Sequence, residues 1–177
     1  MLIQEYNSNW VSDFEKIKQK LETVLSQKTK VEHIGSTSVP HLAAKNIIDI
    51  DIVYFEKTEK VFEQIKKGLI KLGYYHNGNQ GIEDRDVFKR KDTTNEENIL
   101  DKIPHHLYVC SFESEELKRH VLFRDFLREN EEARNEYQNL KYNLAQRVGQ
   151  IKKQYAELKE KEAKSFIESI IRKAREK

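Results

Sequence analysis

The feature that most constrains the fold is residues 47–53, which read Ile-Ile-Asp-Ile-Asp-Ile-Val. Side chains of a β-strand alternate between two faces, so Asp49 and Asp51 share one face and isoleucines occupy the other. Ionised carboxylates on a mostly buried strand are costly unless cations or several hydrogen-bond donors surround them. Their Cα atoms would lie roughly 7 Å apart, so both side chains can converge on one hard metal ion. The pattern predicts an acidic, metal-binding strand face; the alternative is an edge strand with its polar face in solvent.

A turn rich in small residues precedes this strand. Gly35 is followed by the hydroxyl side chains of Ser36, Thr37 and Ser38, and then by Pro40. Glycine lets the backbone approach a ligand closely, and exposed N–H groups and hydroxyls suit phosphate oxygens. The alternative is an ordinary Ser/Thr-rich turn. Because the turn and the acidic pair form one compact unit, we expect a metal-assisted site that acts on phosphates.

Composition excludes several classes of protein. The 177 residues are 37% hydrophobic and 35% charged, which predicts one domain with a modest core under a charged surface. The 32 basic and 30 acidic residues leave a net charge of only +2, so there is no strong nucleic-acid signal. The single cysteine, Cys110, excludes an internal disulfide and indicates a reducing compartment. Without a membrane-length apolar run or a signal-peptide core, we expect a cytoplasmic protein with no membrane partner.

Hydrophobic spacing predicts an α+β fold, with strands first and long helices last. Helices are expected at residues 8–28 and 58–72, at several segments from residue 114 onward, and at 151–173; strands are expected at 30–34, 47–54, 87–90 and 106–110. Between them we expect a helical turn at 41–45, a loop or hairpin at 73–84, and a polar loop at 91–103 as a candidate lid. Residues 1–112 would form an α/β core, with residues 113–177 as helices packed on it in one structural unit.

Several longer motifs resemble the GrpB family. They are Glu32-His33-Ile34-Gly35-Ser36-Thr37-Ser38-Val39-Pro40, Leu42-Ala43-Ala44-Lys45, Ile48-Asp49-Ile50-Asp51, His105-His106-Leu107-Tyr108-Val109, Arg119-His120 and Phe123-Arg124-Asp125-Phe126-Leu127-Arg128. The Gly-Ser turn followed by Asp-Ile-Asp-Ile also resembles the wider nucleotidyltransferase superfold. The resemblance implies a nucleotidyltransferase-like mixed β-sheet with flanking helices and a helical C-terminal part.

The same resemblance implies roles for the site residues. In that superfold the Gly-Ser turn holds nucleotide phosphates and the paired acids bind a divalent metal, Mg²⁺ or Mn²⁺, for in-line attack on the α-phosphorus. Active members add a third carboxylate on a later strand, but residues 106–110 contain no acid. His106 is the candidate for that position and Asp86 is the alternative. The predicted catalytic residues are therefore Asp49, Asp51 and His106, with the two acids as metal ligands.

Basic side chains are candidates to complete an anion site. We expect Lys45 and Arg90, and then Arg124, to contact phosphate together with the turn, because guanidinium groups suit phosphate geometry. Lys141 and Lys164 lie beside the apolar stripes of their helices and rank lower. For most basic residues the alternative is a solvated surface with pairing along a helix.

Two functions follow, and the sequence does not decide whether the chain is an enzyme. One is a metal-dependent nucleotidyltransferase that binds a nucleotide or another phosphorylated small molecule. The alternative is a non-catalytic ligand-binding or accessory module; because related domains occur fused to dephospho-CoA kinases, the resemblance connects this alternative with CoA biosynthesis. A third hypothesis is that the charged C-terminal helices form a protein-interaction surface. The oligomeric state, the nucleotide and the acceptor stay open.

Overall fold

A mixed five-stranded sheet forms the centre of the computed structural model, which describes residues 1–91 and 97–176. The strands are β1 (Thr29–Ile34), β2 (Ile48–Tyr54), β3 (Tyr74–His76), β4 (Arg85–Arg90) and β5 (His105–Ser111). Their order across the sheet is β1-β2-β5-β4-β3, in which β2 and β5 run parallel and the other neighbours run antiparallel. Strand β2 is therefore interior, and the edge-strand alternative for Asp49 and Asp51 is wrong.

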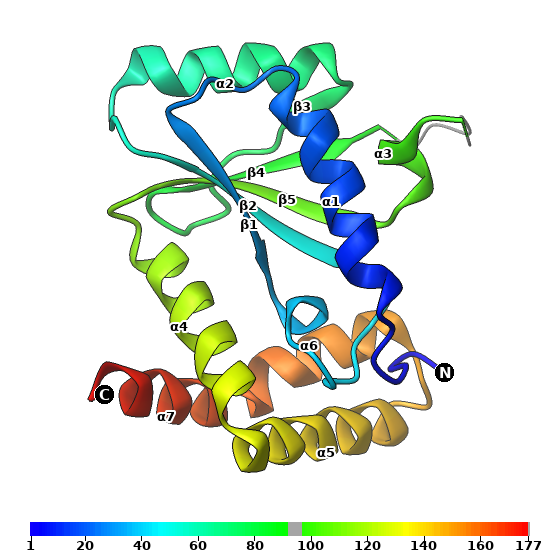
Figure 1. Cartoon of the computed structure of the whole chain (residues 1–177). Coiled ribbons are helices and arrows are strands. Elements are labelled where there is room, and N and C mark those ends of the chain that lie inside the picture. The colour runs from blue at the N-terminus through cyan, green and yellow to red at the C-terminus, as the bar shows by residue number, and fades with distance from the viewer. Residues whose placement is uncertain (92–96, 177) are drawn as a thin grey trace.

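Helices lie on both sides of this sheet (Figure 1). They are α1 (Asn9–Glu22), α2 (Glu59–Lys71), α3 (Ile99–Lys102), α4 (Glu115–Glu129), α5 (Glu131–Arg147), α6 (Lys152–Glu162) and α7 (Lys164–Arg175), with one 3₁₀ turn, η1 (Ser36–Ser38). Figure 1 shows α4 running down from the sheet. Helices α5, α6 and α7 lie below the sheet, near the lower end of α4. The α+β class and the mixed sheet with flanking helices are as the sequence predicts.

The main core forms between one face of the sheet and helices α1 and α2. Ile48, Ile50 and Ile52 are each at most 1% exposed and belong to the same apolar cluster as Trp10 and Phe14 of α1. Leu107 and Val109 of β5 continue this face beside β2. Since the isoleucines of β2 face α1 and α2, the alternating acids must face the opposite side, where the C-terminal helices lie.

The C-terminal helices pack on the core through three apolar clusters, two of which adjoin the sheet face and the turn. On the acidic face of the sheet, Val53 and Cys110 pack against Leu117 of α4. Val39, which follows η1, packs with Tyr137 of α5 in a second cluster that also contains residues of α4 and α7. The turn after β1 is therefore enclosed between the sheet and the helical array.

Two local predictions are wrong, and both have packing reasons. Residues 41–45 are not helical, because Gln4 pairs in both directions with the backbone of Ala44 and Gln138 accepts a bond from the Ala43 amide. The single helix expected at 151–173 is broken into α6 and α7 at the fully buried Ala163. The break lets the two halves pack into different apolar clusters. Of the candidate lid at 91–103, residues 92–96 lie outside the described residues, and α3 occupies part of the rest.

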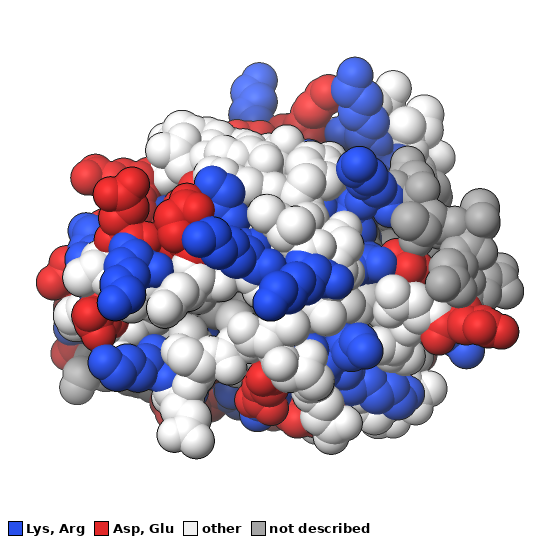
Figure 2. All heavy atoms as spheres, turned by 90° about the horizontal axis from the view of Figure 1, so that it is seen from above, with Lys and Arg blue, Asp and Glu red and all other residues white. Residues whose placement is uncertain are grey.

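The described helices include none that is long and apolar enough to cross a bilayer. Seen from above, the surface carries lysine and arginine side chains interspersed with acidic ones (Figure 2). Cys110 is buried, and burial raises the pKa of its thiol, so the cysteine is inert packing on the sheet.

Candidate functional site

Asp49 and His106 form a pair on the acidic face of the sheet. The parallel register of β2 and β5 sets these residues side by side, and His106 Nδ1 lies 2.9 Å from Asp49 Oδ1. The Asp49 side chain is 29% exposed and that of His106 is 53% exposed, so both reach solvent. The other His106 ring nitrogen, Nε2, points away from this bond and can accept a proton. His105 faces the other side, where it bonds Tyr74 and the Ile103 carbonyl.

Asp51, two residues further along β2, is buried more deeply than Asp49 and bonds to a different histidine. Its side chain is fully buried, and His120 Nδ1 of α4 lies 2.8 Å from its Oδ2. Burial opposes the charged imidazole, but the bonds to Asp51 and Glu116 raise the pKa of His120 to about 9. Asp51 Oδ1 is buried without a hydrogen-bond partner among the described residues. Asp51 therefore has a cationic partner on one oxygen and an unused lone pair on the other.

The turn at Gly35 lies in close contact with the side chain of Asp49. Gly35 has φ 70° and ψ −172°, a conformation that is essentially limited to glycine. A Cβ added at this position would collide with Asp49 Oδ2 and lie 3.0 Å from its Cγ. The glycine is therefore required both by its backbone angles and by the close approach of the turn to the acidic strand.

Only one of the three hydroxyls of the turn is available to a ligand and close to the acids. Ser38 Oγ donates to the Gly35 carbonyl at 2.6 Å, and Thr37 Oγ1 lies 3.0 Å from His33 Nε2. Both side chains are thus used to shape the turn. Ser36 Oγ instead accepts a bond from Lys141 Nζ at 3.2 Å, at the wall of a cavity. The predicted phosphate-binding role rests on Ser36 and on the turn backbone.

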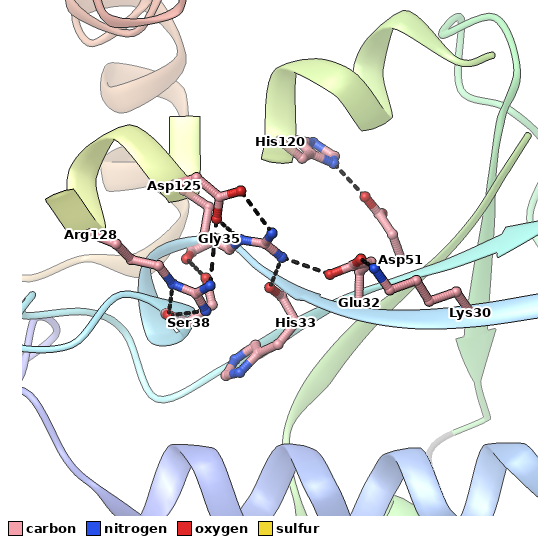
Figure 3. Close-up of polar contacts among 10 residues, drawn as sticks. Lys30, Glu32, His33, Gly35, Ser38, Asp51, His120, Asp125 and Arg128 are labelled. Carbon is pink, nitrogen blue, oxygen red and sulfur yellow. Dashed lines mark hydrogen bonds and ion pairs between the residues drawn. The ribbon is translucent and has the colours of Figure 1, made fainter. Parts of the chain in front are cut away.

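Two arginines of α4, Arg124 and Arg128, donate to backbone carbonyls on either side of Gly35, and Figure 3 shows Arg128 beside Ser38. Arg124 is 9% exposed; its guanidinium pairs with Glu32 at 2.8 Å and with Asp125 at 2.7 Å, and it donates to the His33 carbonyl. Arg128 donates two bonds to the Ser38 carbonyl. The guanidinium of Arg124 is therefore already bonded to residues of β1 and α4 and is not free to contact a ligand. We infer that Arg124 positions the turn.

Replacing Arg124 with methionine is expected to lower the free energy of unfolding at neutral pH by about 3 kcal/mol, because Glu32 and the His33 carbonyl lose a buried partner. Burial opposes ionisation of Glu32, but the bonds from Lys30 and Arg124 outweigh it and lower the pKa of Glu32. The pair's contribution is therefore present above the ordinary carboxyl pKa and is lost as pH falls through the lowered value. Urea unfolding at several pH values measures the difference, with the exposed Arg175→Met as the control. A stability gap that widens in acid would contradict this assignment.

Two adjoining cavities meet at the acidic strand and the turn. The first, of about 230 Å³, is a cationic chamber lined mainly by polar residues: Ile3, Ser36, Thr37, Ala44, Lys45, Ile47, Asp49, His106, Tyr108, Lys141, Tyr155 and Lys159. The second, of about 310 Å³, is an aromatic chamber lined by Ile34, Gly35, Ser36, Asp49, Tyr108, Glu116, Arg119, His120, Phe123, Tyr137, Lys159, Ile167 and Ile171. They share Ser36, Asp49, Tyr108 and Lys159, so one elongated ligand can occupy both.

Three lysines line the cationic chamber. Lys45 follows the turn, Lys141 comes from α5 and Lys159 from α6. None of the three forms an ion pair within 4 Å with an acidic side chain of the described residues. Burial, together with Lys159, holds the pKa of Lys141 well below its ordinary value. An anion in the chamber would offset this cost and favour the charged amine.

Two other predicted residues lie away from this cluster. The guanidinium of Arg90 is taken up by Asp101 and the Leu72 carbonyl, and it lies against the ring of Tyr74. Asp86 pairs in register with Val109, which places it on the opposite face of the sheet, bonded to His76 at 2.6 Å. Asp86 therefore cannot serve as the third acid, whereas His106 lies beside Asp49.

The carboxylate oxygens at this site suit a divalent cation that is bound together with a phosphate ligand. Asp49 lines both chambers and supplies carboxylate oxygens, which Mg²⁺ and Mn²⁺ prefer. Asp51 lines neither chamber, and its Oδ1 is buried without a partner among the described residues, so it could reach a cation only if the site opened around it. The described residues contain no group of three or more His, Cys, Asp or Glu side chains placed to hold a metal by themselves. Since Mg²⁺ is usually held by one or two carboxylates with phosphate oxygens and water, the two acids suit a metal–phosphate complex.

Sequence reasoning missed Lys159 and ranked Lys141 low. Both interrupt apolar stripes: Lys141 stands four residues after the buried Tyr137, and Lys159 stands four residues after the buried Tyr155. A lysine inside the buried stripe of a helix needs a polar cavity or an anion beside it. The four-residue spacing from a buried tyrosine is the sequence pattern that indicates both lysines as candidate site residues.

Comparison with known proteins places the whole chain in one family. The GrpB protein family model matches residues 1–173. The glutamate-rich protein GrpB of Alkalihalophilus pseudofirmus is 31% identical over 172 residues, covering 97% of this chain and 94% of that protein. The UPF0157 protein YqkA of Bacillus subtilis is 32% identical over 170 residues, covering 94% of this chain and 46% of YqkA.

Solved structures agree. The crystal structure of the conserved protein GrpB from Enterococcus faecalis matches with a TM-score of 0.77 and 32% identity, covering 97% of this chain and 96% of that one. A structure of Cid1, described as having RNA terminal uridylyl transferase activity, matches with a TM-score of 0.52 and 13% identity, covering 82% of this chain and 42% of Cid1. At that identity the likeness to Cid1 shows the nucleotidyltransferase-like fold alone. The chain belongs to the GrpB family.

Proposed function

We propose that this protein binds a nucleotide, or a similar phosphorylated small molecule, together with a divalent cation, and that it transfers the nucleotidyl group. The observation that carries the proposal is one cavity wall where Asp49 and Ser36 of the turn meet Lys45, Lys141 and Lys159. Carboxylates alone suit a metal and lysines alone suit an anion. Both together suit a metal–phosphate complex.

The linings of the two chambers support a place for each part of the proposed ligand. The phosphates occupy the cationic chamber, where the turn backbone, the Ser36 hydroxyl and the lysines supply donors. The nucleoside extends into the aromatic chamber, whose walls include Phe123 and Tyr137. A flat base buries apolar surface against such rings. The chambers share Ser36 and Asp49, which sets the phosphate next to the acids at their junction.

Asp49 and Asp51 would hold the cation, which neutralises charge on the phosphate oxygens when bound. In the transfer step an acceptor hydroxyl oxygen forms a bond to the α-phosphorus, and the bond from that phosphorus to the bridging oxygen breaks. Pyrophosphate leaves toward the lysines. The proton of the hydroxyl passes to His106 Nε2, while the bond to Asp49 orients the imidazole.

A non-catalytic ligand-binding module is the second candidate. The residue beside Asp49 on β5 is an imidazole rather than a carboxylate, and one oxygen of Asp51 is already bonded to His120. Both features leave fewer oxygen ligands for metal than three free carboxylates would supply. The same cavity would then bind the ligand without breaking a bond. A cytoplasmic location, expected from the single cysteine, stays a prediction in either case.

Calorimetry tests binding and labelling tests transfer. We expect ATP, CTP, GTP or UTP to bind with a dissociation constant below about 1 mM when Mg²⁺ or Mn²⁺ is present, and about tenfold more weakly in EDTA. Magnesium alone should give little heat, because the two acids do not complete its shell. Release of pyrophosphate from the bound nucleotide would establish transfer, whereas binding without turnover would favour the module. Absence of binding by all four nucleotides would refute the nucleotide site and, with it, the proposed transfer.

A further inference from the structure

A third cavity opens where β4 and β5 part. The two strands pair from Arg85 with Cys110 to Phe88 with Leu107, and beyond this point β4 continues beside β3 instead. The resulting crevice holds about 520 Å³. His106 and Tyr108 form part of its wall and also line the cationic chamber. The crevice therefore adjoins the candidate site through His106 and Tyr108, and no residue of the turn lines it.

The wall of this crevice is basic: it contains Arg85, Lys89, Arg90 and Lys91, and one acid, Asp101, which pairs with Arg90. Arg85 stands opposite Cys110 in register, on the same face as Tyr108, and its Cζ lies 4.8 Å from the centre of the Tyr108 ring. Its Nε is buried without a hydrogen-bond partner among the described residues, and Asp51 and Glu116 act on the guanidinium through charge at longer range. Lys89 on the same wall is exposed. Cationic side chains gathered on one wall suit a phosphate dianion.

We infer that this crevice binds the acceptor of the reaction, a small molecule that carries a phosphate group. The inference rests on the proposed transfer. In an in-line displacement the acceptor enters opposite the leaving group. Pyrophosphate leaves toward Ser36 and the lysines, so the acceptor comes from the His106 side, where the crevice lies. Arg85 and Lys89 hold its phosphate, and His106, shared by both cavities, receives the proton of its hydroxyl.

Methyl-detected NMR with phenyl phosphate as the probe tests the inference. The methyl groups of Val87 and Leu107 report on the crevice, and those of Ala44 and Ile47 report on the cationic chamber. Phenyl phosphate is expected to shift the crevice methyls in a saturable way, with and without magnesium–ATP present. Arg85→Met should weaken this binding about tenfold, while Lys67→Met, an exposed cation on α2, should change it by less than about twofold. Phenol, which lacks the phosphate, should bind at least about tenfold more weakly.

Separate outcomes overturn the two proposals. Shifts confined to Ala44 and Ile47, equal binding of phenol, no binding, or an Arg85→Met variant with native affinity would refute the acceptor site. If Arg85→Met does not fold, Lys89→Met takes its place, with an expected weakening of about threefold, because Lys89 is exposed and makes no packing contribution to the core. If magnesium–ATP fails to move Ala44 and Ile47 while phenyl phosphate moves Val87, the nucleotide site is refuted and the crevice stands as a phosphate site.

Discussion

Replacing Asp49 with asparagine is expected to lower the affinity for a magnesium–nucleotide complex by about 100-fold, which corresponds to about 2.7 kcal/mol. Asparagine keeps the shape of the side chain and its bond to His106 but removes the charge that attracts the cation. Because the Asp49 side chain is 29% exposed, the variant should fold normally. Calorimetry with and without Mg²⁺ measures the effect, and the magnesium dependence should disappear along with the affinity.

A matched control comes from the other face of the same sheet. Asp86 has 25% of its side chain exposed and also pairs with a histidine, His76, but it lies away from the turn and the lysines. Asp86→Asn should therefore leave nucleotide affinity within about twofold of the native value. Equal losses in the two variants would show that the effect is general electrostatics, and unchanged affinity in Asp49→Asn would remove the metal from the site.

The acidic face is the part of the site that can be predicted from local sequence. Alternation in a strand has a period of two, so the isoleucines of residues 47–53 require the two acids to share a face, and the structure confirms this arrangement. The position of His106 beside Asp49 follows from the register of two parallel strands that are far apart in the chain. The family resemblance supplied that pairing, and local periodicity alone did not.

The partners of the charged side chains are less predictable. Arg124 and Lys141 are both basic residues on C-terminal helices, yet one is enclosed by Glu32 and Asp125 and the other lines a ligand-sized cavity. Which of these outcomes occurs depends on how helices separated by about a hundred residues dock on the turn. A burial pattern along one helix shows that a charge is enclosed, but it does not show what encloses it.

Replacing Gly35 with alanine is expected to lower the free energy of unfolding by about 3 kcal/mol or more and to weaken nucleotide binding as well. The backbone angles of Gly35 cost an alanine about 1–3 kcal/mol. The new Cβ would also collide with Asp49 Oδ2, so the turn or the carboxylate must move. In a chain of 177 residues this loss corresponds to a fall in melting temperature of about 6–12 °C.

Gly78 supplies the control that separates the two causes. Its φ is 71°, nearly that of Gly35, but an added Cβ would meet no atom within 4 Å. Gly78→Ala should therefore show only the backbone cost of about 1–2 kcal/mol and no change in nucleotide affinity. Urea unfolding and calorimetry on the two variants give the comparison. If both variants lose the same stability and neither loses affinity, the turn does not approach Asp49 closely. A larger loss at Gly35 would show that the contact between the turn and the acidic strand contributes both to the fold and to the site.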